Sequence, residues 1–409
     1  MTPAAAGSVP LTGLRRLEMV VLLGALTAFA PLSIDMYLPA LPSLQRYFQT
    51  TEGEVQLTLA SFFVGFALGQ SLYGPLADRF GRKRPLYAGM LLYCAASTAC
   101  ALAFSARALA AFRLLQALGA CSGAVMSRAV VRDVFAVQET RRVYSALILV
   151  MGVSPLAAPL LGSYILLWFG WKAIFLSVAA AGALVLLSLH FRMPETLATA
   201  QPLSARYILA TYRALLADRF FLGSTLATGF SSAGMFAYIA GAPFVFINLF
   251  GMRPDRFAWL FGVNAAAVVI GAQINGRVLC GHAPERLMRR AAWVQSAAGI
   301  ALVAAALTEA GGLPRSMLGL ALPLFVYMAT IGFVFPNAVT IALANHGQIA
   351  GMASALLGTL QFSMAAISVL ILGAINSVTA LPMSAAICAC GLLGVGSHLT
   401  LMRSGRSSV

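Results

Sequence analysis

The stretch Gly74-Pro-Leu-Ala-Asp-Arg-Phe-Gly-Arg-Lys-Arg84 joins two long apolar runs, residues 54–77 and 85–105. Gly81 permits a tight reversal of the chain because glycine has no Cβ. Asp78 and the basic residues can pair with one another across a helix end, or with Asp133. A short charged turn between two such runs indicates two membrane-spanning helices, since one span needs about 20 apolar residues.

Apolar runs of this kind follow one another along all 409 residues. Only 10% of the residues are charged and 60% are hydrophobic, whereas a soluble domain carries roughly 25% charged residues. Most of the surface must therefore face lipid. The sequence predicts an all-α polytopic membrane protein with twelve transmembrane helices, at residues 17–41, 54–77, 85–105, 108–132, 142–166, 170–191, 219–249, 257–278, 288–310, 316–343, 348–375 and 380–402.

Lysine and arginine are distributed unevenly between the two sides of this predicted bundle. Nineteen lie on the side that carries both chain ends, six lie on the other side, and two lie within the fourth span. Basic loops are retained in the cytoplasm, so we expect both termini there. The same rule explains the formal net charge of +15. No RNA- or DNA-binding motif accompanies that charge, and we expect no nucleic-acid partner.

The longest connection, residues 193–217, divides the spans into two sets of six. We therefore predict an N-terminal six-helix bundle over residues 1–192, a cytoplasmic linker over 193–217, and a C-terminal six-helix bundle over 218–409. In transporters built from parallel repeats, the substrate path lies at the interface between the repeats.

Asp35 is the one carboxylate that lies clearly inside a predicted span and away from its cytoplasmic end. A charge at that depth is costly, and burial favours the protonated form of a carboxyl group. Both properties suit a reversible proton carrier; an acid near the outer headgroups is the other interpretation. Arg113 lies at a similar depth in the fourth span and requires a partner or water, and Asp35 is the expected partner.

The fourth and fifth spans carry further candidates. Arg128 and Arg132 lie toward the cytoplasmic end of the fourth span, where snorkelling to the membrane surface explains them as well as a function does. The fifth span contains Gly152-Val-Ser-Pro-Leu-Ala-Ala-Pro-Leu-Leu-Gly162. Its two prolines remove backbone hydrogen bonds and bend the helix. A bend without charge predicts a conformational or sealing role.

These motifs together resemble a known family. The charged turn is similar to the loop signature of the major facilitator superfamily, and the fifth-span motif to that of its antiporters, although Ser154 replaces a glycine. Five further stretches resemble the Bcr/CflA drug-resistance exporters: Asp35–Pro42, Arg128–Asp133, Met235–Tyr238 with Ala242–Phe244, Phe335–Asn337 and Gly351–Phe362.

The resemblance implies two pseudo-symmetric six-helix bundles around a central cavity, alternating access, and proton-driven export of bicyclomycin- or chloramphenicol-type drugs across the bacterial inner membrane. It implies proton coupling by Asp35 and Arg113, and an antiporter motif of Gly152, Pro155, Pro159 and Gly162. It also implies a cytoplasmic conformational network of Gly74, Asp78, Arg79, Gly81, Arg82, Lys83, Arg132 and Asp133. In the second half, Asn275-Gly276-Arg277 lacks the acidic residue, so we expect no equal network there.

The resemblance implies that the first, fourth, seventh and tenth spans line the cavity. Aromatic and polar side chains on these spans, and Gln361 on the eleventh, are candidates for substrate binding, because such side chains adapt to varied ligands. The candidates are Tyr37, Gln116, Phe236, Tyr238, Tyr327 and Gln361.

We expect no cofactor and no metal, because the six cysteines lack metal-ligand spacing and the proton gradient supplies the energy. The expected partners are a small-molecule substrate, protons and the lipid bilayer, and the expected state is a monomer. Export of a native metabolite (an amino acid, dipeptide or sugar), with incidental drug resistance, is the alternative function. A receptor or intramembrane enzyme is disfavoured, since the spans hold no Ser/His or paired-carboxylate arrangement.

Overall fold

The computed structural model describes residues 13–135, 137–197, 205–279, 281–310, 316–344, 346, 349–375 and 379–401. The first half contains α1 (Gly13–Asp35), η1 (Leu38–Ala40), α2 (Leu41–Phe48), α3 (Glu52–Phe80), α4 (Lys83–Ala101), α5 (Ala106–Val134), α6 (Val137–Phe169) and α7 (Trp171–Arg192). The second half contains α8 (Ala205–Ala217), α9 (Arg219–Ala242), η2 (Pro243–Leu249), α10 (Pro254–Gln273), η3 (Ile274–Val278), α11 (Pro284–Ala310), α12 (Met317–Leu343), α13 (Ala350–Ala374) and α14 (Leu381–Leu401). No described residue forms a β-strand, and the predicted all-α fold is confirmed.

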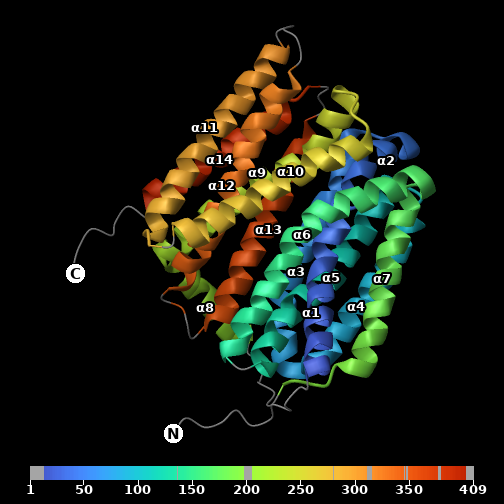
Figure 1. The fold of residues 1–409 in the computed structure, drawn as a ribbon, viewed down its shortest axis with the longest axis vertical. Helices are drawn as coiled ribbons and strands as arrows, with labels where there is room; N and C mark the ends of the chain where they lie inside the picture. The colour runs from blue at the N-terminus through green and yellow to red at the C-terminus, as the bar shows by residue number, and fades with distance from the viewer. Residues whose placement is uncertain are drawn as a thin grey trace, which may run out of the picture.

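The helices fall into two groups that lie side by side. In Figure 1, α1–α7 run from blue to green on one side, and α10–α14 run from yellow to red on the other. Within the first group, α5 packs against both α3 and α4; within the second, α11 packs against α12 and α14. The groups meet where α3 packs against α13 and α6 packs against α10. We call this contact the seam.

Eleven helical segments of the described chain are long and apolar enough to cross a membrane. We assign α4 as a twelfth span. It begins with Lys83 and Arg84, which lower the hydropathy of its first turn, but it carries no charge from Leu86 to Ala101. It packs against α5 and α7 on one side, while Leu91 is exposed on the outer face of the first group. The helices therefore lie where the apolar runs predicted them.

Two predicted spans are less regular than the sequence indicated. The span expected at 17–41 is interrupted after Asp35 and resumes as η1 and α2. The span expected at 219–249 changes from α-helix to π-helix at Pro243, which has no N–H to donate to the preceding turn. Broken helices at membrane depth are tolerated only where protein or a cavity surrounds them.

The α3–α4 turn, the α7–α8 connection and the first residues of α1 lie at one end of the molecule, which we call the basic end because of its arginines. Part of the predicted linker, residues 198–204, lies outside the described residues. The rest contains α8, a helix that the sequence did not predict. Thr211 and Leu215 are buried on one face of α8, while Arg206 and Arg213 are exposed on another.

Candidate functional site

The break in the first span shapes the surroundings of Asp35. Tyr37 donates its backbone N–H to the carbonyl of Ile34 (3.3 Å), three residues back, instead of to the carbonyl of Ser33. The Ser33 carbonyl is thus left for another donor. Asp35 is the last residue of α1 and is 5% exposed.

Two elements from other parts of the chain enclose this break. Gly162 of α6 lies against the backbone of Met36, so closely that a Cβ on residue 162 would overlap the Met36 carbonyl. On the other side of the seam, Tyr238 of α9 lies near enough to Asp35 for the two to interact electrostatically. The hydroxyl of Tyr238 accepts a hydrogen bond from Asn264 Nδ2 (2.9 Å). Asp35 therefore lies between the two halves, beside the predicted antiporter motif.

Arg113 of α5 is completely buried nearby. Its Nη1 donates to the carbonyl of Ser33 (2.8 Å), which the break in α1 left free, and to Gln116 Oε1 (2.8 Å). The guanidinium carbon lies 4.3 Å from the ring centre of Phe62 and 4.6 Å from that of Tyr37. Aromatic faces attract a cation because of their negative quadrupole. The rings face the charge without a carboxylate, whereas Nε and Nη2 of Arg113 are buried and make no hydrogen bond to the described residues.

The expected ion pair between Asp35 and Arg113 does not form in this conformation. Among the described residues, no salt bridge includes either side chain. The sequence pointed to a carboxylate partner because it could not show the carbonyl and the rings that surround Arg113. The joint role of the two residues in proton coupling stays a prediction.

The predicted substrate residues occupy different environments. Tyr37 shares a hydrogen bond with Thr58 (2.7 Å), and Gln116 Nε2 donates to Ser97 Oγ (2.8 Å), both inside the first group of helices. Tyr327 is buried inside the second group, with its hydroxyl against Gly234.

Three of these residues lie on α9 and α13, near the seam. Phe236 contacts Phe63 of α3, with 4.3 Å between ring centres. Gln361 Nε2 donates to Ser232 Oγ (2.7 Å), and Tyr238 lies within electrostatic range of Asp35. The substrate-binding roles of all six residues stay predictions.

The seam is closed at the end opposite to the basic end. Gly53 of α3 lies against Gly373 of α13, and a Cβ on residue 53 would overlap the Gly373 carbonyl. Asn248 Nδ2 reaches Gln45 Oε1 across the seam (3.5 Å). The sequence did not predict this closure, because neither contact carries a recognisable motif.

Aromatic rings close the middle of the seam. Phe66 of α3 lies 4.5 Å from Phe362 of α13, which also contacts Phe236 (5.7 Å between ring centres). The spacing of Phe62, Phe63 and Phe66 on one helix was a signal for such a cluster, since residues three and four apart share a helix face.

A cavity of about 550 Å³ separates the halves toward the basic end. Its walls come from α3, α5, α8 and the first turn of α13, including Gln70, Gly74, Arg128 and Arg132. None of the six predicted substrate residues is among the described residues that line it. Gly74 and Arg132, which the sequence assigned to the conformational network, form part of its wall.

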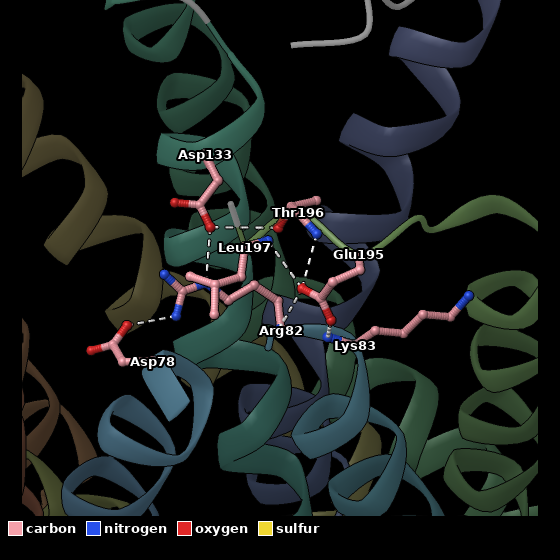
Figure 2. A network of polar contacts seen from close by, with 7 residues as sticks. All are labelled: Asp78, Arg82, Lys83, Asp133, Glu195, Thr196 and Leu197. Carbon is pink, nitrogen blue, oxygen red and sulfur yellow. Dashed lines mark hydrogen bonds and ion pairs between the residues drawn. The ribbon is translucent and has the colours of Figure 1, made fainter. Parts of the chain in front are cut away.

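Arg82 is the centre of the polar network at the basic end, which Figure 2 shows. Its Nη1 donates to Asp78 Oδ1 (2.6 Å) and its Nε to Asp133 Oδ2 (2.8 Å). The side chain of Arg82 is 4% exposed and that of Asp133 is 16% exposed. The nearly buried guanidinium of Arg82, in the α3–α4 turn, therefore links the end of α3 to the end of α5. Arg79 and Lys83 lie outside this ion pairing, over the rings of Phe80 (5.0 Å) and Tyr87 (5.9 Å) respectively.

Glu195, in the connection after α7, completes the network, a role that its sequence position did not predict. Its carboxylate accepts the backbone N–H groups of Arg82 (2.8 Å), Lys83 (3.1 Å), Thr196 (2.9 Å) and Leu197 (3.0 Å) (Figure 2). Partial burial acts to raise the pKa of this carboxyl, but the four donors outweigh it and hold the pKa below its usual range.

Gly81 allows the turn to approach this carboxylate. Its φ is +87°, which side chains with a Cβ rarely adopt, and a Cβ there would overlap the Glu195 carboxylate. The turn predicted at Gly81 is thus observed. Glycine is required there both by the backbone conformation and by the close approach of Glu195, which is distant in sequence.

Replacing Glu195 with glutamine should release the linker from the α3–α4 turn. Charge-assisted hydrogen bonds are about twice as strong as neutral ones, so amide exchange at Arg82, Lys83, Thr196 and Leu197 should quicken by about tenfold or more at pH 7. Because the pKa is lowered, the contact has its full strength above the ordinary carboxyl pKa. It weakens as the pH falls through the lowered value.

Glu18→Gln is a matched control. Glu18 pairs with the exposed Arg192 (2.9 Å) at the same end of the molecule, and its loss should leave those four amides unchanged. Hydrogen exchange measured by mass spectrometry checks both variants. Equal protection of residues 82–83 and 196–197 in Glu195→Gln and the wild type contradicts this role of Glu195.

The fifth-span motif lies along α6, where it faces the second half and the break in α1. Pro155 and Pro159 are both inside the helix. A Cβ on Gly152 would lie 3.5 Å from Val269 of α10, an ordinary contact, whereas Gly162 permits the close approach to Met36. The motif thus contacts both the seam and the break in the chain that follows Asp35.

In the second half, the region that corresponds to the α3–α4 turn follows α10 and contains a pair of hydrogen-bonded amide side chains. Asn337 Nδ2 of α12 donates to Asn275 Oδ1 of η3 (2.8 Å). From the sequence we expected no network equal to that of Arg82 in this part of the chain, because no acidic residue takes the place that Asp78 has in the first half.

The match to a family model decides the class of protein. Residues 23–369 match the model described as Major Facilitator Superfamily. The chain belongs to the major facilitator superfamily. It is therefore a multi-pass membrane transporter and not an enzyme, as the sequence predicted.

Individual relatives agree with this assignment. The chain is 37% identical to an uncharacterized MFS-type transporter, YdgK, of Bacillus subtilis (strain 168), over 97% of this chain and 99% of that protein. It is 29% identical to a bicyclomycin resistance protein homolog of Haemophilus influenzae, over 93% and 95% of the two chains. Among solved structures, a D-xylose-proton symporter matches with a TM-score of 0.72 at 16% identity, over 93% of this chain and 96% of that one. That likeness concerns the fold alone.

Proposed function

We propose that this transporter is a proton-coupled antiporter that exports drugs or other small amphipathic molecules across the bacterial inner membrane. The observation that carries the proposal is the placement of Asp35. This carboxyl ends a broken helix at the seam, 5% exposed, between Gly162 of the antiporter-like motif and Tyr238 of the other half. An ionisable group in such a position marks an ion or proton pathway.

The basic end faces the cytoplasm in this proposal, because basic loops are retained on that side. Both chain termini then lie in the cytoplasm, and the cavity of about 550 Å³ opens toward it. The closed seam at Gly53 and Gly373 separates the cavity from the outside. The conformation is thus the inward-facing member of an alternating-access pair.

The proposed cycle follows from this arrangement. A drug enters from the cytoplasm while Asp35 gives up its proton to that side. The bundles 1–192 and 218–409 then rock about the seam, the basic end closes, and the opposite end opens. A proton from outside binds Asp35 as the drug leaves, and the protonated carrier returns. One monomer contains both halves of this path, with residues 193–217 as the tether.

The names of relatives support drugs as the cargo rather than a native metabolite. The bicyclomycin resistance protein homolog matches over nearly its whole length, and the motifs resemble the Bcr/CflA exporters. The cavity volume is also in the range of about 300–1,000 Å³ that suits drug-sized ligands.

Expression in a bacterial host that lacks its own drug exporters tests this cargo. We expect the minimal inhibitory concentrations of bicyclomycin or chloramphenicol to rise several-fold, as measured by broth dilution. A chain with an Asp35→Asn substitution, expressed to the same level, serves as the control. Unchanged susceptibility to both drugs and to a wider antibiotic panel would favour the metabolite exporter instead.

A further inference from the structure

A second cavity, of about 240 Å³, lies at the closed end of the seam beside Gly53, which we call the outer end. Its walls come from α2 and α3 of the first half and from α9, η2, α13 and α14 of the second half. Asn248 and Ile375 line it and are exposed, so the cavity is reached from the surface at this end. A molecule inside it therefore contacts both halves at once.

Glu52, the first residue of α3, is the one charged residue among the described residues that line this cavity. Its Oε1 accepts a hydrogen bond from Gln56 Nε2 (2.8 Å), and Gln56 is 1% exposed, which holds the carboxylate in place. In the described part of the chain, no salt bridge includes Glu52. The cavity thus contains a fixed carboxylate that forms no ion pair with a described side chain.

The neighbouring acid Glu54 has a different environment. It pairs with Arg107 (3.0 Å) and is not among the residues that line the cavity. Both acids lie in the first turn of α3, where a negative charge stabilises the positive end of the helix dipole. The dipole explains why an acid occurs in this turn, but it does not explain why one of the two carboxylates lies in a cavity.

The rest of the lining suits an amine that carries an apolar group. Gln45 of α2 and Asn248 of η2 contribute amide groups from opposite sides of the seam, and Asn248 Nδ2 reaches Gln45 Oε1 (3.5 Å). An ammonium group has three N–H donors and no acceptor, so carboxylate and amide oxygens match it. The apolar part of the wall includes Phe244, Leu372 and Met383. Apolar walls with a few polar groups are typical of small-molecule sites.

We propose that this outer cavity binds small organic ammonium ions with an apolar body, through Glu52, and that the bound ion holds the outer end of the seam closed. A ligand that contacts both halves only while they meet shifts the equilibrium toward that conformation. The consequence for transport rests on the proposed function, in which this end faces the outside. There, such an amine inhibits export from the side opposite to the one where cargo enters.

Benzylamine and benzyl alcohol test the preference for an ammonium group, because they share the ring and the number of heavy atoms. Benzylamine is cationic at pH 7 and benzyl alcohol is neutral. Their binding to the purified full chain is measured by saturation-transfer difference NMR in phosphatidylcholine nanodiscs, with empty nanodiscs subtracted. We expect benzylamine to bind about tenfold more tightly than benzyl alcohol, with the difference shrinking at high salt.

Substitutions assign the preference to Glu52. Glu52→Gln should bind the two compounds with affinities within about twofold of each other, because the charge is gone, whereas Glu52→Asp keeps the charge and should keep the preference. Glu54→Gln is the matched control and should behave as the wild type. Asp35→Asn should also keep the preference, since Asp35 does not line this cavity.

Hydrogen exchange measured by mass spectrometry tests the closure of the seam. Saturating benzylamine should slow exchange several-fold in the peptides that contain Gly53 and Gly373, which lie in contact across the seam. The same peptides of Glu52→Gln should exchange equally with and without benzylamine.

Four results overturn the inference. Equal binding of the two compounds to the wild type, or an unchanged preference in Glu52→Gln, excludes the ammonium site. Loss of the preference in Asp35→Asn places the amine at the coupling carboxylate instead, and unchanged exchange at saturating benzylamine excludes the closure. None of these measurements requires transport, and drug-induced proton exchange in everted vesicles without amine would persist if only this inference is wrong.

Discussion

Replacing Asp35 with asparagine should abolish drug-induced proton release from everted membrane vesicles. Asparagine keeps the size of the side chain and its place at the end of α1, but it cannot exchange a proton near neutral pH. The lumen of such vesicles corresponds to the outside of the cell and is acidified by respiration. Adding drug to wild-type vesicles should therefore release protons from the lumen, which a pH-sensitive dye reports as restored fluorescence.

The expected signal for Asp35→Asn equals that of vesicles without the protein. Drug binding to the purified variant should stay within about twofold of the wild type, because a neutral amide resembles the protonated carboxyl in size and polarity. Glu54→Gln is a matched control, since Glu54 lies in an exposed pair with Arg107 (3.0 Å) near the opposite end. Exchange at the wild-type rate in Asp35→Asn excludes this residue as the proton carrier.

Replacing Gly162 with alanine should have the second largest effect. The added methyl group would overlap the Met36 carbonyl, so α6 must move away from the break that holds Asp35. Overpacking of this kind typically costs about 1–3 kcal/mol. The same displacement moves the seam, because α6 also packs against α10. We expect the drug-induced proton exchange rate to fall by about tenfold or more, as a displaced coupling group would require.

Gly152→Ala, in the same helix, provides the comparison. Its new Cβ would lie 3.5 Å from Val269, which is ordinary van der Waals contact, so exchange should stay close to that of the wild type. Equal activity of the two alanine variants would show that the contact with Met36 does not govern coupling. The thermal stability of both variants, measured in detergent, separates loss of fold from loss of transport.

The helices were predictable from the sequence because each apolar run must satisfy its own backbone hydrogen bonds in lipid. Asp35 and Gly162 were also predictable, since an acid in a span and a Pro/Gly pattern without charge stand out locally. Their proximity was not, because it depends on the break in α1 and on the approach of α6. The partner of Arg113 was wrongly expected to be Asp35, since a freed backbone carbonyl and aromatic faces leave no charge pattern in the sequence.

Glu195 shows a second limit. Its carboxylate bonds to the backbone of Arg82, 113 positions away, and backbone donors are not visible as a residue type. The cavity at the basic end likewise combines α3, α5, α8 and α13, and α8 was not expected as a helix. The aromatic closure of the seam had a local signal in Phe62, Phe63 and Phe66, but its partners on α9 and α13 lie in the other half.

Transport by the purified protein in liposomes tests proton-coupled export most directly. The lumen is buffered one pH unit below the outside, and radiolabelled bicyclomycin is added outside, without ATP. Because one pH unit is worth about 1.4 kcal/mol per proton, exchange of one proton predicts accumulation of the drug by about tenfold, lost when a protonophore collapses the gradient. Accumulation that needs ATP, or that persists unchanged with the protonophore, would contradict proton-coupled antiport.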